Sequence, residues 1–326
     1  MSFNRREFIR VSGITAAGSL VVTPLIYSCN RIKLSDSAES YFNHFEVTPE
    51  LMQKVISAAM EKGADYADLF FEHTLANYSA LEDGKVNSSY SNIDFGVGIR
   101  VLKGEQTGYA YSESLMPDAM IKAARTAANI ADSSGKYSPV SINEYVAPNY
   151  YPVKTSWEEI SVKDKIPFIQ RLNDNIFAED KRVTKVNAVL GDSASYILFC
   201  NSEGLVAWDY RPMVILYGVC IMEQNGQIEN FFVGRSHRMG YEFLTNELVD
   251  ELSKSVVTKT SLLFNAGQPK AGEMEVVMGA GESGILLHEA IGHAFEADFN
   301  RKNLSIFSDK MGNRIAEDFV KIVDDG

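Results

Sequence analysis

Apolar and polar residues alternate with a period of two along much of the chain, which is the pattern of half-buried β-strands. In the first such region, turn sequences at Glu82–Lys85 and Lys103–Gln106 separate the expected strands. These strands are Tyr66–Leu75, Phe95–Leu102 and Gly108–Tyr111. In the second region the turn signals are Asn201–Gly204 and Asn225-Gly226. The strands expected there are Val186–Leu190, Ser195–Cys200, Leu205–Tyr210, Met213–Met222 and Gln227–Gly234.

Helices are predicted on both sides of these strands. Thr48 is a capping residue and Pro49 suits a first turn, so a helix should begin here and end near Lys62, before Gly63. Further helices are expected at Pro117–Ala131, Ser161–Phe177 and Tyr241–Leu263. Three prolines mark residues 136–156 as a connector between the two strand regions.

Composition and charge narrow the possible functions. The chain has 326 residues, a net charge of −12 and a sequence pI near 5.0, so sequence-independent nucleic-acid binding, which needs a basic face, is not expected. Its three cysteines, Cys29, Cys200 and Cys220, do not form a disulfide framework. Cys200 and Cys220 lie in apolar runs and are expected to be small buried residues rather than a disulfide.

The N-terminus has the layout of an export signal. Arg5 and Arg6 precede the moderately apolar stretch Val11–Ile26, as in twin-arginine signals. The stretch ends in Leu25–Cys29, which resembles a bacterial lipoprotein cleavage box, so Cys29 is a candidate lipidation site. We therefore expect residues 1–28 to be a signal and residues 29–46 a tether. The protein would then be periplasmic or a membrane-anchored lipoprotein.

The segment from His288 to His293 has the residues needed for metal-dependent hydrolysis. Neutral imidazoles bind zinc, and the carboxylate of Glu289 can take a proton from a water that the metal activates. The histidines are at positions i and i+5, which on an ideal α-helix leaves their side chains about 140° apart. They can share one ion only if the helix is widened or broken, and Gly292 is where a π-bulge or kink would meet least steric resistance.

Two other interpretations of this region remain open. The histidines and the glutamate could be ordinary residues of an amphipathic helix. The loop Gly279–Gly284 also spells the dinucleotide-binding pattern G-x-G-x-x-G after an expected strand, Glu275–Met278. Because no apolar strand ending in an acidic residue follows at the required distance, the loop more simply makes a tight turn. There Gly281 and Gly284 would let a substrate backbone approach.

These elements in order predict an α+β protein. Residues 47–135 form an N-terminal α/β domain, and residues 136–265 comprise the connector and a β-rich middle region. Residues 266–326 form the metal-binding segment of a β-rich C-terminal domain. Val320–Val323 looks like a strand that enters a turn without a return strand. We therefore expect this domain to be truncated at its C-terminus.

The motif His288-Glu289-Ala290-Ile291-Gly292-His293 and the residues after it, Ala294–Lys302, resemble the TldD-like branch of the TldD/PmbA family of metallopeptidases. The blocks Ala64–Phe70, Gly96–Val101 and Gly108–Ala110 also resemble the N-terminal domain of that family. The resemblance covers about residues 47–326. It implies a two-domain zinc (Zn²⁺) peptidase that binds peptides in extended form and assembles as a dimer, often of unlike subunits.

The resemblance also implies a third zinc ligand, a cysteine far downstream in the family. No cysteine follows Cys220, so this ligand is expected beyond Gly326. An alternative is that Glu296 or Asp298, just after the motif, supplies an oxygen ligand instead.

The sequence thus predicts a zinc-dependent peptidase that hydrolyses unfolded or extended peptides. His288 and His293 would hold the metal, and Glu289 would be the general base. A homodimer, or a heterodimer with a PmbA-like relative, is expected, with a lipid anchor at Cys29. The main alternative is a non-catalytic peptide-binding subunit, which the presence of all three motif residues disfavours. A nucleotide-binding protein using Gly279–Gly284 is the weaker alternative.

Overall fold

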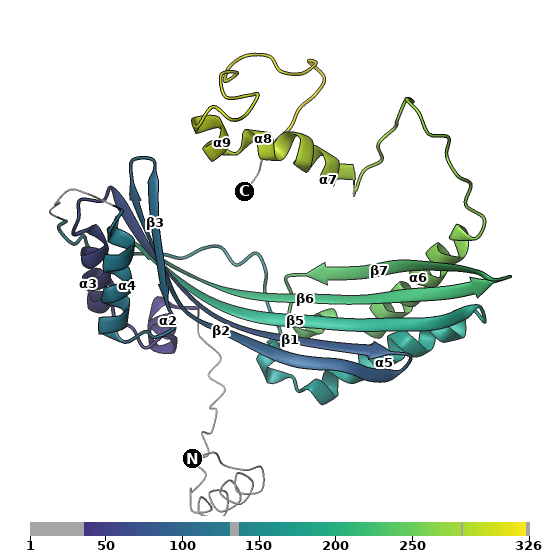
Figure 1. Ribbon diagram of the computed structural model, residues 1–326. Helices are drawn as coiled ribbons and strands as arrows, with labels where there is room; N and C mark the ends of the chain where they lie inside the picture. The colour runs from purple at the N-terminus through teal and green to yellow at the C-terminus, as the bar shows by residue number, and fades with distance from the viewer. Residues whose placement is uncertain (1–35, 131–136, 282, 324–326) are drawn as a thin grey trace, which may run out of the picture. The chain divides into compact units, whose positions relative to one another are not determined.

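The structure, a computed structural model, describes residues 36–130, 137–281 and 283–323. A single sheet of seven strands organises the described residues that precede Gly267 (Figure 1). The strand order is β3-β2-β1-β5-β6-β4, and β7 also pairs with β6. All pairs are antiparallel except β4 with β6. The strands are β1 (Tyr66–Glu82), β2 (Lys85–Lys103), β3 (Gln106–Ser112), β4 (Asn143–Tyr145), β5 (Val183–Asn201), β6 (Leu205–Gln224) and β7 (Gln227–His237). The predicted signal and Cys29 lie outside the described residues.

The predicted hairpin turns are confirmed. Asp83 and Gly84 join β1 to β2 with φ of 49° and 75°, and Asn225 and Gly226 join β6 to β7 with φ of 52° and 82°. Two consecutive positive φ values twist a two-residue turn in the direction that antiparallel strands require, which is why Asp-Gly and Asn-Gly occur there. The strands themselves are longer than predicted. The runs on either side of Gly191–Ala194 are one strand, β5, because these four residues pair with both β1 and β6.

The helices follow the sequence signals closely. Thr48 Oγ1 accepts the N–H of Leu51 at 3.2 Å at the start of α3, and Thr245 caps α6 in the same way. The predicted helix at Tyr241–Leu263 is therefore divided into a 3₁₀ turn, η2 (Tyr241–Phe243), and α6. The helices of this part are α2 (Ala38–His44), α3 (Pro49–Met60), α4 (Pro117–Ala128), α5 (Val162–Glu179) and α6 (Asn246–Leu263), with a further 3₁₀ turn η1 (Trp157–Glu159).

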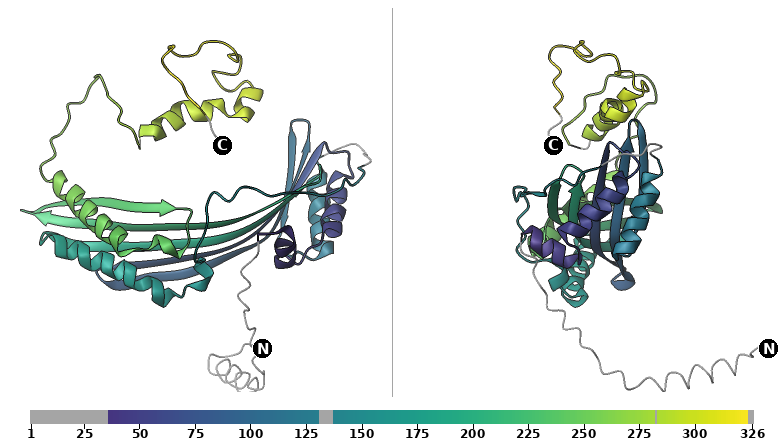
Figure 2. Two further views of the ribbon diagram at one scale, coloured as in Figure 1. Left: turned by 180° about the vertical axis from the view of Figure 1, so that it is seen from behind. Right: turned by 90° about the vertical axis from the view of Figure 1, so that its left-hand side faces the viewer.

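Two hydrophobic cores share one face of the sheet. Cys200 and Leu198 of β5 belong to the core under α2, α3 and α4, whereas Leu190 and Val186 belong to the core under α5 and α6. All four are even-numbered positions of one continuous strand, so their side chains point to the same side. Figures 1 and 2 show α3 and α4 at one end of the sheet, and α5 and α6 side by side along the other half. The first domain and the middle region are thus joined by a continuous sheet.

The helix α2 lies within the residues that we expected to be a tether. Tyr41 and Phe45 are 3% and 1% exposed and belong to the first core. The end of the expected tether, residues 38–46, is therefore packed against the sheet.

A polar cluster occupies the same face between the two cores. His44 of α2 and His73 of β1 are hydrogen-bonded, with Nε2 and Nδ1 2.9 Å apart. Beside them, Tyr196 and Tyr210 donate to the two oxygens of Glu158 at 2.6 and 2.9 Å. Burial and the neighbouring His73 lower the pKa of His44 to about 4, and burial also lowers the pKa of His73. The folded protein therefore favours neutral imidazoles at this contact.

Acid should weaken the folded state through this histidine pair. Because the pKa of His44 is lower when folded, the unfolded chain binds more protons below about pH 6.5, and stability should fall between about pH 6.5 and pH 4. The loss would reach about 1.4 kcal/mol per pH unit for a fully shielded group, and it should be smaller here because solvent partly reaches the ring.

Urea unfolding at pH 7.5 and pH 5 would measure this effect. Replacing His44 with Gln should reduce the difference between the two pH values. His237→Gln, at an exposed histidine, should not change it. An unchanged pH dependence in His44→Gln would contradict the assignment.

The residues from Gly267 onward form a second unit. It contains α7 (Ser283–Leu287), the π-helical turn η3 (His288–Gly292), α8 (His293–Phe295) and α9 (Ala297–Arg301).

The prediction of a strand at Glu275–Met278 is wrong, because this segment has no strand partner among the described residues and Val277 is 97% exposed. The described part of the expected end strand, Val320–Val323, is also irregular. The α+β fold class is confirmed. Among the described residues, however, all strands belong to the sheet that precedes the metal-binding segment, and none lies within that segment.

No helix within the described ranges is both long and apolar enough to cross a membrane.

Candidate metal centre

The predicted irregularity of the histidine helix is confirmed. The residues His288–Gly292 form a π-helical turn between α7 and α8. The backbone N–H of His293 donates to the carbonyl oxygen of His288, which is the i to i+5 bond of a π-helix. Because the turn holds one residue more than an α-helical turn, position i+5 comes to lie above position i. The five-residue spacing therefore puts the two histidines on the same side.

The side chains of His288 and His293 are brought together by this turn. Their ring centroids lie 4.5 Å apart, with the planes at 64° to one another. A ligand atom from each histidine and one from Glu289 all lie within 4.8 Å of one another. Ligand atoms that share one zinc ion are about 3–4 Å apart, so this set is close to the required spacing. The nitrogen and oxygen donors present are those that zinc accepts.

The carboxylate of Glu289 lies beside the Nε2 atom of His293. Its Oε2 is 3.5 Å from Nε2 of His293, and its side chain is 61% exposed. A carboxylate in this position can accept a proton from a water near the two imidazoles. The predicted catalytic residue and the two predicted ligands therefore occur together in the structure.

Glu296 contacts the other nitrogen of His293. Its Oε1 lies 2.7 Å from Nδ1, and this hydrogen bond raises the pKa of His293. Neither Glu296 nor Asp298 belongs to the group of ligand atoms formed by the histidines and Glu289. The sequence suggests both residues as oxygen ligands, but it carries no signal for the hydrogen bond between Glu296 and His293.

The glycine loop before the helix is open. The N–H of Gly284 donates to the carbonyl oxygen of Gly281 at 2.9 Å, and Gly281 has a φ of 110° that favours glycine. A Cβ added at Gly279, Gly281 or Gly284 would have no atom within 4 Å. These three positions therefore face open space. The dinucleotide interpretation, however, lacks the strand that must precede such a loop.

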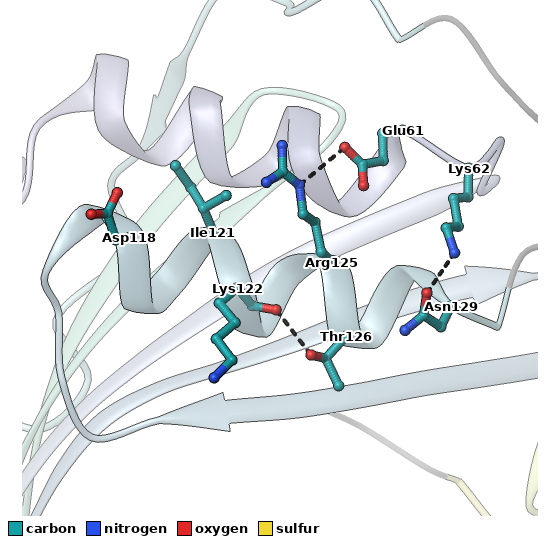
Figure 3. A pocket seen from close by; sticks show the side chains of 8 residues that line it. All are labelled: Glu61, Lys62, Asp118, Ile121, Lys122, Arg125, Thr126 and Asn129. Atoms are coloured by element: carbon teal, nitrogen blue, oxygen red, sulfur yellow. Dashed lines mark hydrogen bonds and ion pairs between the residues drawn. The ribbon is translucent and has the colours of Figure 1, made fainter.

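A separate open depression of about 530 Å³ lies on α3 and α4 (Figure 3). Arg125 Nε lies 3.3 Å from Glu61 Oε2, and Lys62 Nζ donates to Asn129 Oδ1 at 2.5 Å across the two helices. Its lining residues are Glu61, Lys62, Asp118, Ile121, Lys122, Arg125, Thr126 and Asn129. These polar contacts connect two surface helices, and none of the residues belongs to the candidate metal centre.

Family models match most of the chain. The models of the PmbA/TldA metallopeptidase family match as domain 1 at residues 67–131, as the central domain at residues 155–264 and as the C-terminal domain at residues 271–326. A helix that presents two histidines and a glutamate to one point fits that description. The chain belongs to the PmbA/TldA metallopeptidase family, and the resemblance seen in the sequence is confirmed.

Curated relatives agree with this assignment. The chain is 33% identical over 288 residues to a protein of Haemophilus influenzae named "Metalloprotease TldD homolog", covering 86% of this chain and 60% of the relative. It is 30% identical over 295 residues to a protein of the same name from Buchnera aphidicola, covering 88% and 61%. A "Zinc metalloprotease TldD homolog" of Saccharolobus solfataricus is 24% identical over 291 residues, covering 84% and 59%. The chain thus spans about 60% of the length of these relatives.

Solved structures show the same fold. A protein of Thermotoga maritima, described as a proposed modulator of DNA gyrase, matches with a TM-score of 0.63 at 20% identity, over 80% of this chain and 58% of that one. TldE of Thermococcus kodakarensis matches with a TM-score of 0.58 at 18% identity, over 80% and 58%.

Proposed function

We propose that the protein is a zinc-dependent peptidase that hydrolyses unfolded or extended peptides. The observation that carries this proposal is the π-helical turn, which gathers His288, His293 and Glu289 at one point. The names of the relatives support metal-dependent proteolysis, and the name of one of them specifies zinc. Because the chain spans about 60% of the length of these relatives, the activity is proposed for the protein in its natural length.

Each motif residue has one role in this proposal. His288 and His293 would hold the metal through neutral imidazole nitrogens. When bound, zinc supplies a Lewis acid that polarises a scissile carbonyl and makes a nearby water more acidic. Glu289 takes the proton of the attacking water and can return it to the leaving amine, since its carboxylate lies beside the imidazoles. Gly281 and Gly284 would let an extended substrate backbone approach.

Other parts of the proposal rest on the sequence resemblance. Catalytic zinc sites have three protein ligands, and the third is proposed to be a cysteine outside residues 1–326. The partner is proposed to be a second copy or a PmbA-like relative. The twin-arginine signal and lipidation of Cys29 likewise remain proposals, because residues 1–35 lie outside the described part of the chain.

Removing the metal should abolish peptide hydrolysis. A strong chelator should inactivate the protein, and zinc should restore it, because the imidazoles alone cannot polarise a carbonyl. His288→Ala and His293→Ala should stay inactive after zinc is added. His237→Ala, at an exposed histidine of β7, should behave as wild type. Cleavage of an unstructured peptide, followed by mass spectrometry, would measure this.

The same assay separates the proposal from its main alternative. A non-catalytic peptide-binding subunit would bind the peptide without cleaving it, whether or not zinc is present. Hydrolysis that survives chelation, or that survives both histidine replacements, would contradict a metal-dependent mechanism at this site.

A further inference from the structure

We propose that Glu296 is a positioning residue of the metal centre, which holds the His293 imidazole so that its Nε2 faces the metal. This inference rests on the proposed function of His293 as a ligand. Glu296 would not touch the metal or the substrate. It would act through the ring of His293 alone.

The two nitrogens of His293 have different surroundings. Nδ1 lies 2.7 Å from Glu296 Oε1, whereas Nε2 lies on the other side of the ring, 3.5 Å from Glu289 Oε2. A carboxylate accepts hydrogen bonds and cannot donate them when ionised, so Glu296 selects the tautomer that carries the proton on Nδ1. The lone pair is then on Nε2, the nitrogen on the side of Glu289. Carboxylates that orient metal-binding histidines in this way also make the ring a stronger ligand.

The backbone at Glu296 is arranged for this contact. The helix α8 ends at Phe295, and Glu296 has φ −55° and ψ 135°, so the chain leaves the helical conformation there. The N–H of Glu296 still donates to the carbonyl oxygen of His293 at 3.2 Å. This bond keeps residue 296 beside the ring of residue 293, where its side chain can reach Nδ1.

Side chains from further along the chain hold this break in place. Asn300 Nδ2 donates to the carbonyl oxygens of Ala294 at 2.8 Å and Glu296 at 2.9 Å. Ser305 Oγ also donates to the carbonyl oxygen of Ala294, at 2.5 Å. The carbonyl oxygen of Glu296 also accepts the backbone N–H of Asn300 at 3.1 Å, so Asn300 contacts this break through both its backbone and its side chain. The position of Glu296 is therefore fixed by more than its own side chain.

Asp298 provides a matched comparison. It is an acidic residue two positions further on, and its ligand atoms do not belong to the group around the histidines. Replacing it by Asn changes the charge of the segment as much as replacing Glu296 by Gln. An effect of charge alone would appear in both variants, whereas an effect of positioning would appear only at Glu296.

The first measurement is zinc affinity, by competition with a chromophoric chelator, on the protein in its natural length. Loss of a residue that orients a metal-binding histidine typically weakens metal binding about 10–100-fold. We expect Glu296→Ala to show such a loss and Glu296→Gln a smaller one, since an amide oxygen can still accept from Nδ1. Asp298→Asn should bind zinc as wild type. Wild-type affinity in Glu296→Ala would overturn the inference.

A second measurement distinguishes positioning from direct ligation. The cobalt(II)-substituted protein should keep its absorption bands in Glu296→Ala once enough metal is added, because no ligand is lost. Bands that change in energy or intensity would make Glu296 a ligand and overturn the inference. Nitrogen NMR of metal-free protein should show His293 protonated on Nδ1 in wild type and a mixture of tautomers in Glu296→Ala.

These measurements distinguish failure of the positioning role of Glu296 from failure of the proposed zinc-dependent function. Equal zinc affinity in wild type and Glu296→Ala refutes the positioning role and leaves the proposed function intact. Failure of the wild-type protein to bind zinc at all refutes both.

Discussion

Glu289→Gln should retain zinc binding and lose peptide hydrolysis. Glutamine has nearly the same shape as glutamate, so the π-helical turn and the two imidazoles should stay in place. It cannot accept the proton of the attacking water, and loss of a general base typically costs about 10²–10⁴-fold in rate. The measurement is cleavage of an unstructured peptide by zinc-loaded variants, with zinc content determined in parallel. Glu275→Gln, at an exposed acidic residue of the same unit, serves as the control.

Two other outcomes would contradict the role of Glu289 as a general base. A zinc-loaded Glu289→Gln protein with full activity would remove Glu289 from the mechanism. Loss of zinc together with activity would instead make Glu289 a ligand, which its place in the same group of ligand atoms permits. Only retained zinc with lost activity supports the role of a base.

The sequence predicts the core of this site because simple geometry limits the possibilities. Two histidines five residues apart cannot share an ion on a regular α-helix, so the spacing predicts a π-bulge or a break between them, and the structure has a π-helical turn there. The role of Glu296 could not be predicted in the same way. It depends on a helix break at one residue, which Asn300 and Ser305 stabilise through backbone carbonyls. Nothing in the spacing of His293 and Glu296 indicates that break.

The sequence predicts the individual strands and turns better than it predicts which distant strands pair. Turn chemistry at Asp83-Gly84 and Asn225-Gly226 identified the hairpins, because few residues adopt positive φ. The pairing of β1 with β5 joins residues more than 100 positions apart and has no local signal. The buried polar residue Asp192 lies in β5 between the runs Val186–Leu190 and Ser195–Cys200, which the sequence predicts as two separate strands. The segment Glu275–Met278 has the apolar residues of a strand but no partner among the described residues, and pairing is what makes a strand.

Asp192 is itself part of the contact whose loss should most destabilise the fold. Lys165 of α5 donates to both oxygens of Asp192 at 2.8 Å, and the two side chains are only 4% and 2% exposed. Asn77 Nδ2 of β1 also donates to Asp192 at 2.9 Å, and the ammonium lies 5.2 Å from the ring centroid of Trp157. The pair therefore connects a helix of the second core to the middle of the sheet.

Lys165→Met should lower the free energy of unfolding by about 3–5 kcal/mol, because it leaves the carboxylate of Asp192 buried without its counter-charge. The double variant Lys165→Met/Asp192→Leu should be much closer to wild type, since removing both charges removes the desolvation cost. Urea unfolding near pH 7 would measure both.

A surface ion pair provides the control. Arg171→Met breaks the pair of Arg171 with Asp250, in which the two side chains are 43% and 40% exposed, and it should lower the free energy of unfolding by about 1 kcal/mol or less. If Lys165→Met costs no more than Arg171→Met, the buried pair does not hold α5 to the sheet. If the double variant is as unstable as the single one, lost packing rather than an unpaired charge is the cause.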